Sequence, residues 1–327
     1  MVFHKARYWD LCFFLIFIND LPTEIQECMT DIYADDTTLS TSGTPNDQVQ
    51  VQERLQKDVD NMKTWSEKNH MVLNPTKTKT MLVTGKRLSK KVPSTELKVY
   101  IDREQIQQVS TQKLLGLIID KEMSFNEHVD KLSTKLAQKI GVLRKIRRCL
   151  PIRERMLYYN CMIKPNMMYG GTIWSSCSSE KLQRIFRLQK RAARTILNAD
   201  KTARSVDLFS KLGWIPFFDE IKINKCKLIY KRLNDFTPSY IEQLLTRNSD
   251  IHVRQTRHGK TNLVCPWYKR ETEGGRSFTV SSVKLWNSLP NSIKKSESFN
   301  RFNKAIRSYF LTKYEHIDNF ETLIFNT

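Results

Sequence analysis

Apolar residues recur at three- and four-residue spacing along several long segments, and this spacing predicts amphipathic helices. The run from 49 to 69 places one apolar face on a single side of such a helix: Val51, Leu55, Val59, Met62 and Trp65. The same periodicity predicts further helices over residues 129–150, 153–163, 181–196, 221–233 and 299–311. Beyond residue 120 the chain is therefore expected to be mostly helical.

Shorter segments have strand character instead. Met29–Tyr33 and Thr37–Ser40 are rich in β-branched and aromatic residues and flank Ala34, Asp35 and Asp36, which predicts a β-hairpin that presents the two carboxylates. Residues 97–101 and 115–119 are also strand-like and are expected to pair with each other. Within the second run, Gly116 permits either a close backbone approach or a β-bulge. Strands followed by helices predict an α+β fold.

The adjacent carboxylates Asp35 and Asp36 are the main candidates for chemistry. Two-metal nucleotidyl transfer needs oxygen ligands that hold two cations about 3.5–4 Å apart. Mg²⁺ prefers such carboxylates and retains several waters. The structural alternative is that Asp-Asp is ordinary turn chemistry, because Asp bonds its own backbone and tolerates tight bends.

Charge is distributed unevenly over the 327 residues, whose net charge is +20. Residues 1–120 hold fifteen Lys or Arg against sixteen Asp or Glu, residues 121–200 hold seventeen against six, and residues 201–327 hold twenty-two against twelve. The excess positive charge thus lies outside the segment with the Asp pair. This separation fits a protein that grips a phosphate backbone with basic helices.

Two of the predicted helices carry basic stripes beside their apolar faces. The nucleic-acid-binding candidates are Lys131, Lys135, Lys139, Arg144, Lys145, Arg184, Arg187 and Arg191. For any single side chain, a solvated helix face is an equally good explanation. The scarcity of acidic residues between 131 and 153 favours nucleic acid, because exposed helices usually alternate the signs of their charges.

Several motifs around Tyr33-Ala34-Asp35-Asp36 occur in a familiar order. They are Phe14–Pro22 (FLIFINDLP), Leu73–Thr80 (LNPTKTKT), Leu114–Asp120 (LLGLIID), Ser124–His128 (SFNEH), Arg276–Phe278 (RSF) and Leu285–Pro290 (LWNSLP). From about Phe13 to its C-terminus, the chain resembles the reverse transcriptases of non-LTR (LINE-type, jockey-like) retrotransposons. The resemblance implies RNA-directed DNA synthesis with Mg²⁺, an RNA template, a DNA primer and deoxynucleotides.

The same resemblance implies three parts: a polymerase palm over residues 1–120, a helical thumb over 121–200 and a mostly helical C-terminal domain over 201–327. Asp35 is then the direct metal ligand, with Asp36 as its supporting partner and Tyr33 placing the hairpin against the primer. Lys77 and Lys79 resemble lysines near the incoming nucleotide, although an exposed structural loop is the more ordinary explanation. Runs 97–101 and 115–119, with Gly116, resemble the primer-grip hairpin. Reduced, intracellular thiols are the default for seven scattered cysteines, and the expected location is the cytoplasm and nucleus.

The chain also departs from the family pattern. Residues 6–13 do not follow it, and the first catalytic Asp and the fingers that family members carry further upstream are missing. We therefore expect a truncated palm and a two-ion Mg²⁺ site that is incomplete, so that this polypeptide is inactive alone. One alternative is a non-catalytic, nucleic-acid-binding remnant of a mobile element, and another is a decayed reading frame whose product does not fold.

Other features limit the remaining classes of site. The seven cysteines show no Cys-x-x-Cys spacing, so neither a zinc ribbon nor a disulfide framework is expected. The apolar run 11–18 is too short to span a membrane and is expected to end a buried palm helix. The aromatic residues of the last third are expected to be core residues more often than base-stacking platforms: Trp214, Phe217, Phe218, Trp267, Phe278, Trp286, Phe299, Phe302 and Tyr309. Oligomeric state cannot be predicted from these patterns.

Overall fold

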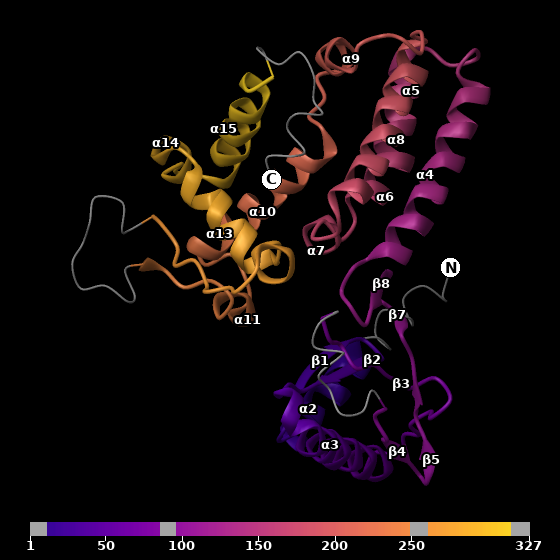
Figure 1. The fold of residues 1–327 in the computed structure, drawn as a ribbon, viewed down its shortest axis with the longest axis vertical. Coiled ribbons are helices and arrows are strands. Elements are labelled where there is room, and N and C mark those ends of the chain that lie inside the picture. The colour runs from indigo at the N-terminus through magenta and orange to yellow at the C-terminus, as the bar shows by residue number, and fades with distance from the viewer. Residues whose placement is uncertain (1–11, 86–95, 249–260, 315–327) are drawn as a thin grey trace. The chain divides into compact units, whose positions relative to one another are not determined.

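The computed structural model describes residues 12–85, 96–248 and 261–314 (Figure 1). Its contacts divide the chain into two compact units, Met1–Met123 and Ser124–Thr327. The mixture of helices and small sheets is consistent with the predicted α+β class. In the part of the chain that the structure describes, no helix is both long enough and apolar enough to cross a membrane.

The first unit combines one long helix with short strands. Its elements are η1 (Ile18–Asp20), α2 (Leu21–Glu24), β1 (Met29–Tyr33), β2 (Asp36–Ser40), η2 (Pro45–Asp47), α3 (Gln48–Lys68), β3 (Lys79–Thr80), β4 (Tyr100–Ile101), β5 (Glu104–Gln105), β6 (Gln107–Gln108), β7 (Thr111–Leu114) and β8 (Leu117–Asp120). The strands form two-stranded sheets with the orders β1-β2, β3-β6, β4-β5 and β7-β8. Helix α3 matches the predicted helix over residues 49–69 to within one residue at each end.

Two small apolar clusters hold this unit together. Val59 of α3 packs with Val99, Ile101 and Ile106, and the partly buried Leu39 of β2 joins them. Trp65, near the end of α3, packs with Ile18 and Leu21, and Ile32 of β1 lies against that cluster. The hairpin β1–β2 is therefore attached to α3 through one apolar residue from each strand.

The expected pairing of residues 97–101 with 115–119 is wrong. Tyr100–Ile101 pairs with Glu104–Gln105, and Thr111–Leu114 pairs with Leu117–Asp120, so each run belongs to its own tight hairpin. In the second hairpin Leu115 and Gly116 form the turn with φ angles of 45° and 86°. Both central residues of a type I′ turn need positive φ, and glycine adopts it without strain. The tight turn at residues 115–116 thus pairs residues 117–120 with 111–114, and the two apolar runs 97–101 and 115–119 do not pair.

The apolar segment near the N-terminus also differs from expectation. Residues 12–17 are helical, as predicted, but they do not form a buried helix end. Phe13 is 63% exposed and Ile16 is 72% exposed, whereas Ile18 and Leu21 just beyond are buried. Ile18 and Leu21 pack with Trp65 in the core, and Phe14 lies partly buried against the same cluster.

The second unit is helical. It contains α4 (Asn126–Ile146), α5 (Ile152–Tyr158), the π-helical turn η4 (Tyr159–Ile163), α6 (Lys164–Met168), α7 (Gly171–Trp174), α8 (Ser179–Leu197), α9 (Ser205–Leu212), α10 (Phe217–Leu233), α11 (Ser239–Glu242), the π-helical turn η5 (Glu271–Gly275), α13 (Phe278–Ser288), α14 (Asn291–Lys294) and α15 (Phe299–Thr312). The helix predicted to run to residue 150 ends at Ile146, and Arg147–Cys149 form a turn. Helices α4 and α8 lie side by side (Figure 1).

The Leu285–Pro290 motif is structural. The Trp286 ring is 1% exposed, and its indole nitrogen donates a hydrogen bond to the Thr261 carbonyl at 2.7 Å. The Asn287 side chain accepts from the Leu263 amide at 3.0 Å and donates to the Leu263 carbonyl at 2.9 Å. One amide side chain thus pairs with the backbone of residue 263 as a neighbouring strand would. The motif fastens α13 to the segment that begins at Thr261.

Most aromatic residues of the last third are core residues, as expected. Phe217, Phe302 and Trp286 are each at most 1% exposed, and the rings of Tyr230 and Phe302 stack at 4.4 Å between centroids. Among the nine aromatic residues named from the sequence, Trp267 differs, because 86% of its surface is exposed; Phe236 and Tyr240, which were not named there, are exposed to 67% and 66%.

Candidate functional site

The Asp pair lies at the tip of the β1–β2 hairpin, as the sequence predicts. Tyr33 pairs with Asp36, so Ala34 and Asp35 form the turn and Asp36 begins strand β2. Ala34 has a φ of 53°, a backbone region that non-glycine residues seldom adopt and that occurs often at functional sites. The tight turn therefore brings two adjacent carboxylates to the end of a fixed hairpin.

Strand alternation decides which hairpin residues face outward. Thr30 and Ile32 are partly buried, whereas Met29, Asp31 and Tyr33 are exposed. Tyr33 is 67% exposed, directly across from Asp36. The outer face thus presents an aromatic ring beside the carboxylates, and the inner face is fixed to the core by Ile32.

Both carboxylates have the chemistry of Mg²⁺ ligands. Asp35 and Asp36 are exposed, and no ion pair or hydrogen bond engages either carboxylate within the described residues. In the same described ranges, no group of three or more His, Cys, Asp or Glu residues is placed to hold a metal ion. The hairpin therefore presents two exposed carboxylates, and the described residues place no third such group beside them.

Asp20 is engaged elsewhere. Its carboxylate accepts a hydrogen bond from the indole nitrogen of Trp65 at 3.1 Å, and the following residue, Leu21, is 2% exposed. The Asn-Asp-Leu-Pro segment at 19–22 therefore anchors the end of α3. The Asp20 carboxylate thus has a structural partner in Trp65.

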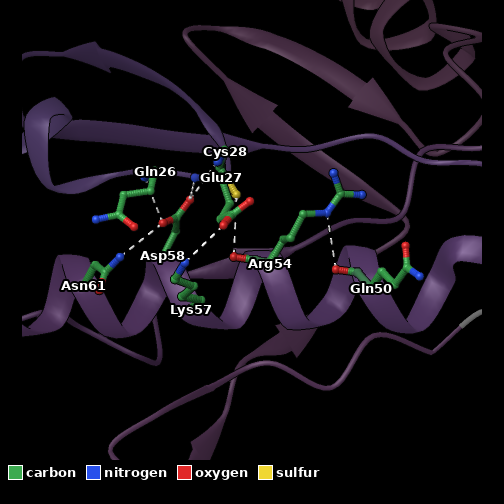
Figure 2. A network of polar contacts seen from close by, with 8 residues as sticks. All are labelled: Gln26, Glu27, Cys28, Gln50, Arg54, Lys57, Asp58 and Asn61. Carbon is green, nitrogen blue, oxygen red and sulfur yellow. Dashed lines mark hydrogen bonds and ion pairs between the residues drawn. The ribbon is translucent and has the colours of Figure 1, made fainter.

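Asp58, which is not among the site residues predicted from the sequence, holds the segment that leads into the hairpin. Asp58 is 0% exposed, and its carboxylate accepts hydrogen bonds from three consecutive backbone amides, those of Gln26 at 3.0 Å, Glu27 at 2.8 Å and Cys28 at 2.7 Å (Figure 2). Asn61, one turn along α3, donates to the same carboxylate at 3.2 Å. Cys28 immediately precedes β1, so this carboxylate fixes the start of the strand that leads to the Asp pair.

The electrostatics of Asp58 follow from these contacts. Burial raises the pKa of its carboxyl group, but the backbone hydrogen bonds to the charged form outweigh burial and leave the pKa below its usual value. A sequence signal for this role was available. Asp58 is three residues after Leu55 and four before Met62, so it falls on the apolar face of the predicted helix.

Lys77 and Lys79 are held by a turn that Asn74 organises. The Asn74 carbonyl accepts hydrogen bonds from the amides of Lys77 at 3.2 Å and Thr78 at 3.0 Å. Lys77 is exposed, whereas Lys79 lies in β3 and its ammonium donates to the Thr76 carbonyl at 2.8 Å and to Gln107 at 2.7 Å. Lys79 thus has structural partners, and Lys77 keeps its charged end in solvent.

A groove in the second unit gathers three of the predicted basic residues. It lies between α4 and α8, has a volume of about 500 Å³, and is lined by Arg184, Arg187 and Arg191 on α8 together with polar side chains of α4 that include Thr134 and Gln138. Ala137 and Leu188 complete the lining, so the groove is partly apolar, and its arginine guanidinium groups are the donors that suit phosphate oxygens.

The other predicted basic residues lie elsewhere. Lys131 forms an ion pair at 2.7 Å with Glu127, one turn before it, and Arg184 forms one with Asp130. Lys135 and Lys139 are on α4 but do not line the groove, because the residues of α4 that face α8 are one or two positions away. Arg144 and Lys145 are exposed in the last turn of α4. All three arginines of the groove are exposed, and Arg187 and Arg191 differ from Arg184 in that Arg184 is engaged by Asp130.

Comparisons with known proteins agree on one family. Residues 12–119 match the family model for reverse transcriptase (RNA-dependent DNA polymerase). A probable RNA-directed DNA polymerase from transposon X-element of Drosophila melanogaster is 28% identical over 160 residues, covering 48% of this chain and 17% of the relative. The corresponding polymerase from transposon BS of the same species is 28% identical over 209 residues, covering 61% and 22%.

A third relative extends the similarity further along the chain. The RNA-directed DNA polymerase from mobile element jockey of Drosophila funebris is 23% identical over 239 residues, which is 70% of this chain and 25% of the relative. The chain thus spans at most about a quarter of the length of these three relatives. No solved structure matches it. Residues 12–119 are therefore similar to reverse transcriptases, and the chain as a whole is similar to the RNA-directed DNA polymerases of Drosophila transposable elements.

Proposed function

We propose that this chain is part of a non-LTR retrotransposon RNA-directed DNA polymerase and contributes the carboxylate hairpin and a nucleic-acid grip. The observation that carries the proposal is the hairpin itself, which presents Asp35 and Asp36, free and exposed, inside a segment that matches the reverse transcriptase family. In this proposal the first unit is the second part of a palm, and α4, α5 and α8 form the thumb.

The proposed roles follow from the placement of each residue. Asp35, at the turn, is the direct Mg²⁺ ligand, and Asp36, the first residue of β2, supports it. Tyr33 lies across from Asp36 and stacks its ring against the primer end. Bound Mg²⁺ supplies activation of the primer hydroxyl and neutralisation of the phosphate charge. Exposed Lys77 is better placed than Lys79 to meet a nucleotide phosphate, because Lys79 already has two partners.

The chain by itself is proposed to bind nucleic acid without extending a primer. Two ions must be clamped at once, and the described residues place no third ligand beside Asp35 and Asp36. RNA template and DNA primer are the proposed partners, held along the α4–α8 groove by Arg187 and Arg191. A deoxynucleotide enters only where a further carboxylate completes the metal site.

Primer extension on an RNA template, measured beside filter binding of the same primer–template, tests this proposal. We expect binding that weakens as salt rises, with no Mg²⁺-dependent extension above that of an Asp35→Asn variant. Extension by the unmodified chain that Asp35→Asn abolishes would overturn the incomplete site and support a complete polymerase. If the chain neither binds nor extends, the proposed function fails.

A second candidate is a nucleic-acid-binding protein without any catalytic part. The observation that favours it is that the groove and most of the positive charge lie beyond residue 119, outside the matched segment. Under this candidate Asp35→Asn changes no property of the chain, including metal binding at the hairpin. Metal mapping therefore separates the two candidates.

A further inference from the structure

We infer that Trp267 is a platform on which a base of single-stranded nucleic acid stacks, forming a second contact far along the chain from the α4–α8 groove. Its indole is 86% exposed, whereas the rings of Trp65, Trp174, Trp214 and Trp286 are each at most 9% exposed. Tryptophan is on average one of the more buried residue types, since exposing its large apolar ring is unfavourable. An indole exposed to this extent contributes little apolar contact to the core and is available to an external partner.

The backbone on the N-terminal side of Trp267 is held rigidly. The Thr261 carbonyl accepts from Trp286, and Leu263 is bonded in both directions by Asn287. One residue further on, the Val264 amide donates to the Thr246 carbonyl at 2.9 Å. The exposed indole is therefore attached to a fixed segment, so stacking on it orders little additional chain.

The C-terminal side is fixed as well. The Tyr268 hydroxyl accepts from the Lys284 ammonium at 2.6 Å, and that ammonium lies 4.5 Å from the centre of the Tyr268 ring. Lys284 is also paired with Glu271 at 3.1 Å. The turn at Gly274 packs closely on Tyr268, because a Cβ on Gly274 would come within 2.7 Å of the Tyr268 Cβ. Tyr268 is thus held by contacts within the fold, whereas the indole of the preceding residue, Trp267, is exposed to solvent.

Charge selects the kind of partner. Among the described residues that adjoin Trp267 in sequence, Lys269 and Arg270 are basic, Lys269 is exposed, and the next acidic side chain, Glu271, is already paired with Lys284. An exposed aromatic ring with basic neighbours fits single-stranded nucleic acid, whose bases stack and whose phosphates are anionic. The choice of nucleic acid over another anionic surface rests on the proposed function, but the contact itself involves neither the Asp pair nor the groove.

Tryptophan fluorescence of the full chain tests the inference directly. The probe is oligo(rA), and the background is a Trp9→Phe chain, since Trp9 lies outside the described residues. Because the four other described tryptophans are buried, we expect oligo(rA) to quench mainly the emission of Trp267. Trp267→Ala should remove this quenching and weaken binding roughly tenfold by fluorescence anisotropy of labelled RNA, whereas Trp267→Phe should retain most of the affinity.

The matched control is Phe236→Ala, which removes another exposed aromatic ring, 67% exposed, and should leave the affinity unchanged. If oligo(rA) binds without quenching, or with equal affinity to the Trp267→Ala chain, the inference fails while the proposed function stands. If no variant binds RNA at all, both fail. A blue shift of Trp267 emission with phosphatidylserine vesicles, without quenching by RNA, would also overturn the inference and assign the ring to a membrane surface.

Discussion

Replacing Asp58 by alanine is expected to destabilise the first unit by about 3 kcal/mol or more, a larger loss than most single substitutions cause. The substitution leaves three consecutive backbone amides, those of Gln26, Glu27 and Cys28, without their acceptor and removes the fully buried side chain that supplies it. Hydrogen exchange of the full chain, followed by mass spectrometry of peptides covering residues 24–40, measures the effect locally. Those peptides should exchange faster than in the unmodified chain.

The control for Asp58 is Asp60→Ala on the same helix. Asp60 is exposed, and its carboxylate accepts a side-chain hydrogen bond from Gln56 at 2.8 Å. We expect Asp60→Ala to leave the exchange of residues 24–40 nearly unchanged. Equal effects from the two substitutions would show that Asp58 does not fix the hairpin's entry.

The difference in stability between the unmodified chain and Asp58→Ala is expected to depend on pH, and the sign of that dependence is fixed. The folded-state pKa of Asp58 lies below the unfolded value of about 4, because backbone hydrogen bonds stabilise its charged form. Its contribution to stability is therefore complete above pH 4 and is lost as the pH falls through the folded-state pKa. The unmodified chain and Asp58→Ala should converge in stability below pH 4, and a difference that grows on acidification would contradict this assignment.

Removing Arg187 and Arg191 together is expected to weaken nucleic-acid binding roughly thirtyfold at moderate salt. The plot of log K against log salt should also become less steep, its negative slope decreasing in magnitude by about two. Both side chains are exposed on α8 and line the groove with α4, so each can meet one phosphate. Fluorescence anisotropy of a labelled primer–template, titrated at several salt concentrations, gives both quantities. Folding should be unaffected, since exposed arginines contribute little to stability.

The matched control removes two charges that the structure pairs elsewhere. Lys131 is bonded to Glu127 and Arg301 to Glu297, each one helical turn away. A Lys131→Ala/Arg301→Ala chain has the same net charge as the Arg187→Ala/Arg191→Ala chain. We expect a smaller loss of affinity from this control. Equal losses would mean that total charge, and not the groove, determines binding.

Local patterns predicted those elements whose stability is local. The β1–β2 hairpin follows from β-branched residues on both sides of a tight Asp turn, and α3 follows from five apolar residues at helical spacing. The prediction that residues 97–101 pair with 115–119 was wrong because local turns also decide these pairings. Two tight turns, at Asp102–Arg103 and Leu115–Gly116, close separate hairpins, and all four of these residues have positive φ.

The contacts of Asp58 and the lining of the groove could not be predicted from the sequence, because both depend on how separate elements pack together. Asp58 stands in an apolar stripe, but its partners are backbone amides about thirty residues earlier, which no side-chain pattern marks. Which basic residues share an opening depended on the face that α4 turns to α8, and that face excludes Lys131, Lys135 and Lys139. Periodicity predicted both helices without fixing how they pack.

Iron-directed cleavage of the full chain tests most directly whether the hairpin is the metal-binding part of a polymerase. Fe²⁺ bound in place of Mg²⁺ generates hydroxyl radicals with ascorbate and peroxide, and mass spectrometry locates the backbone cuts. We predict cuts between residues 33 and 38 that excess Mg²⁺ suppresses, that Asp35→Asn abolishes and that the exposed Asp60→Asn leaves unchanged. Cuts that are absent from the hairpin, or that persist in Asp35→Asn, would contradict the assignment of Asp35 as a metal ligand.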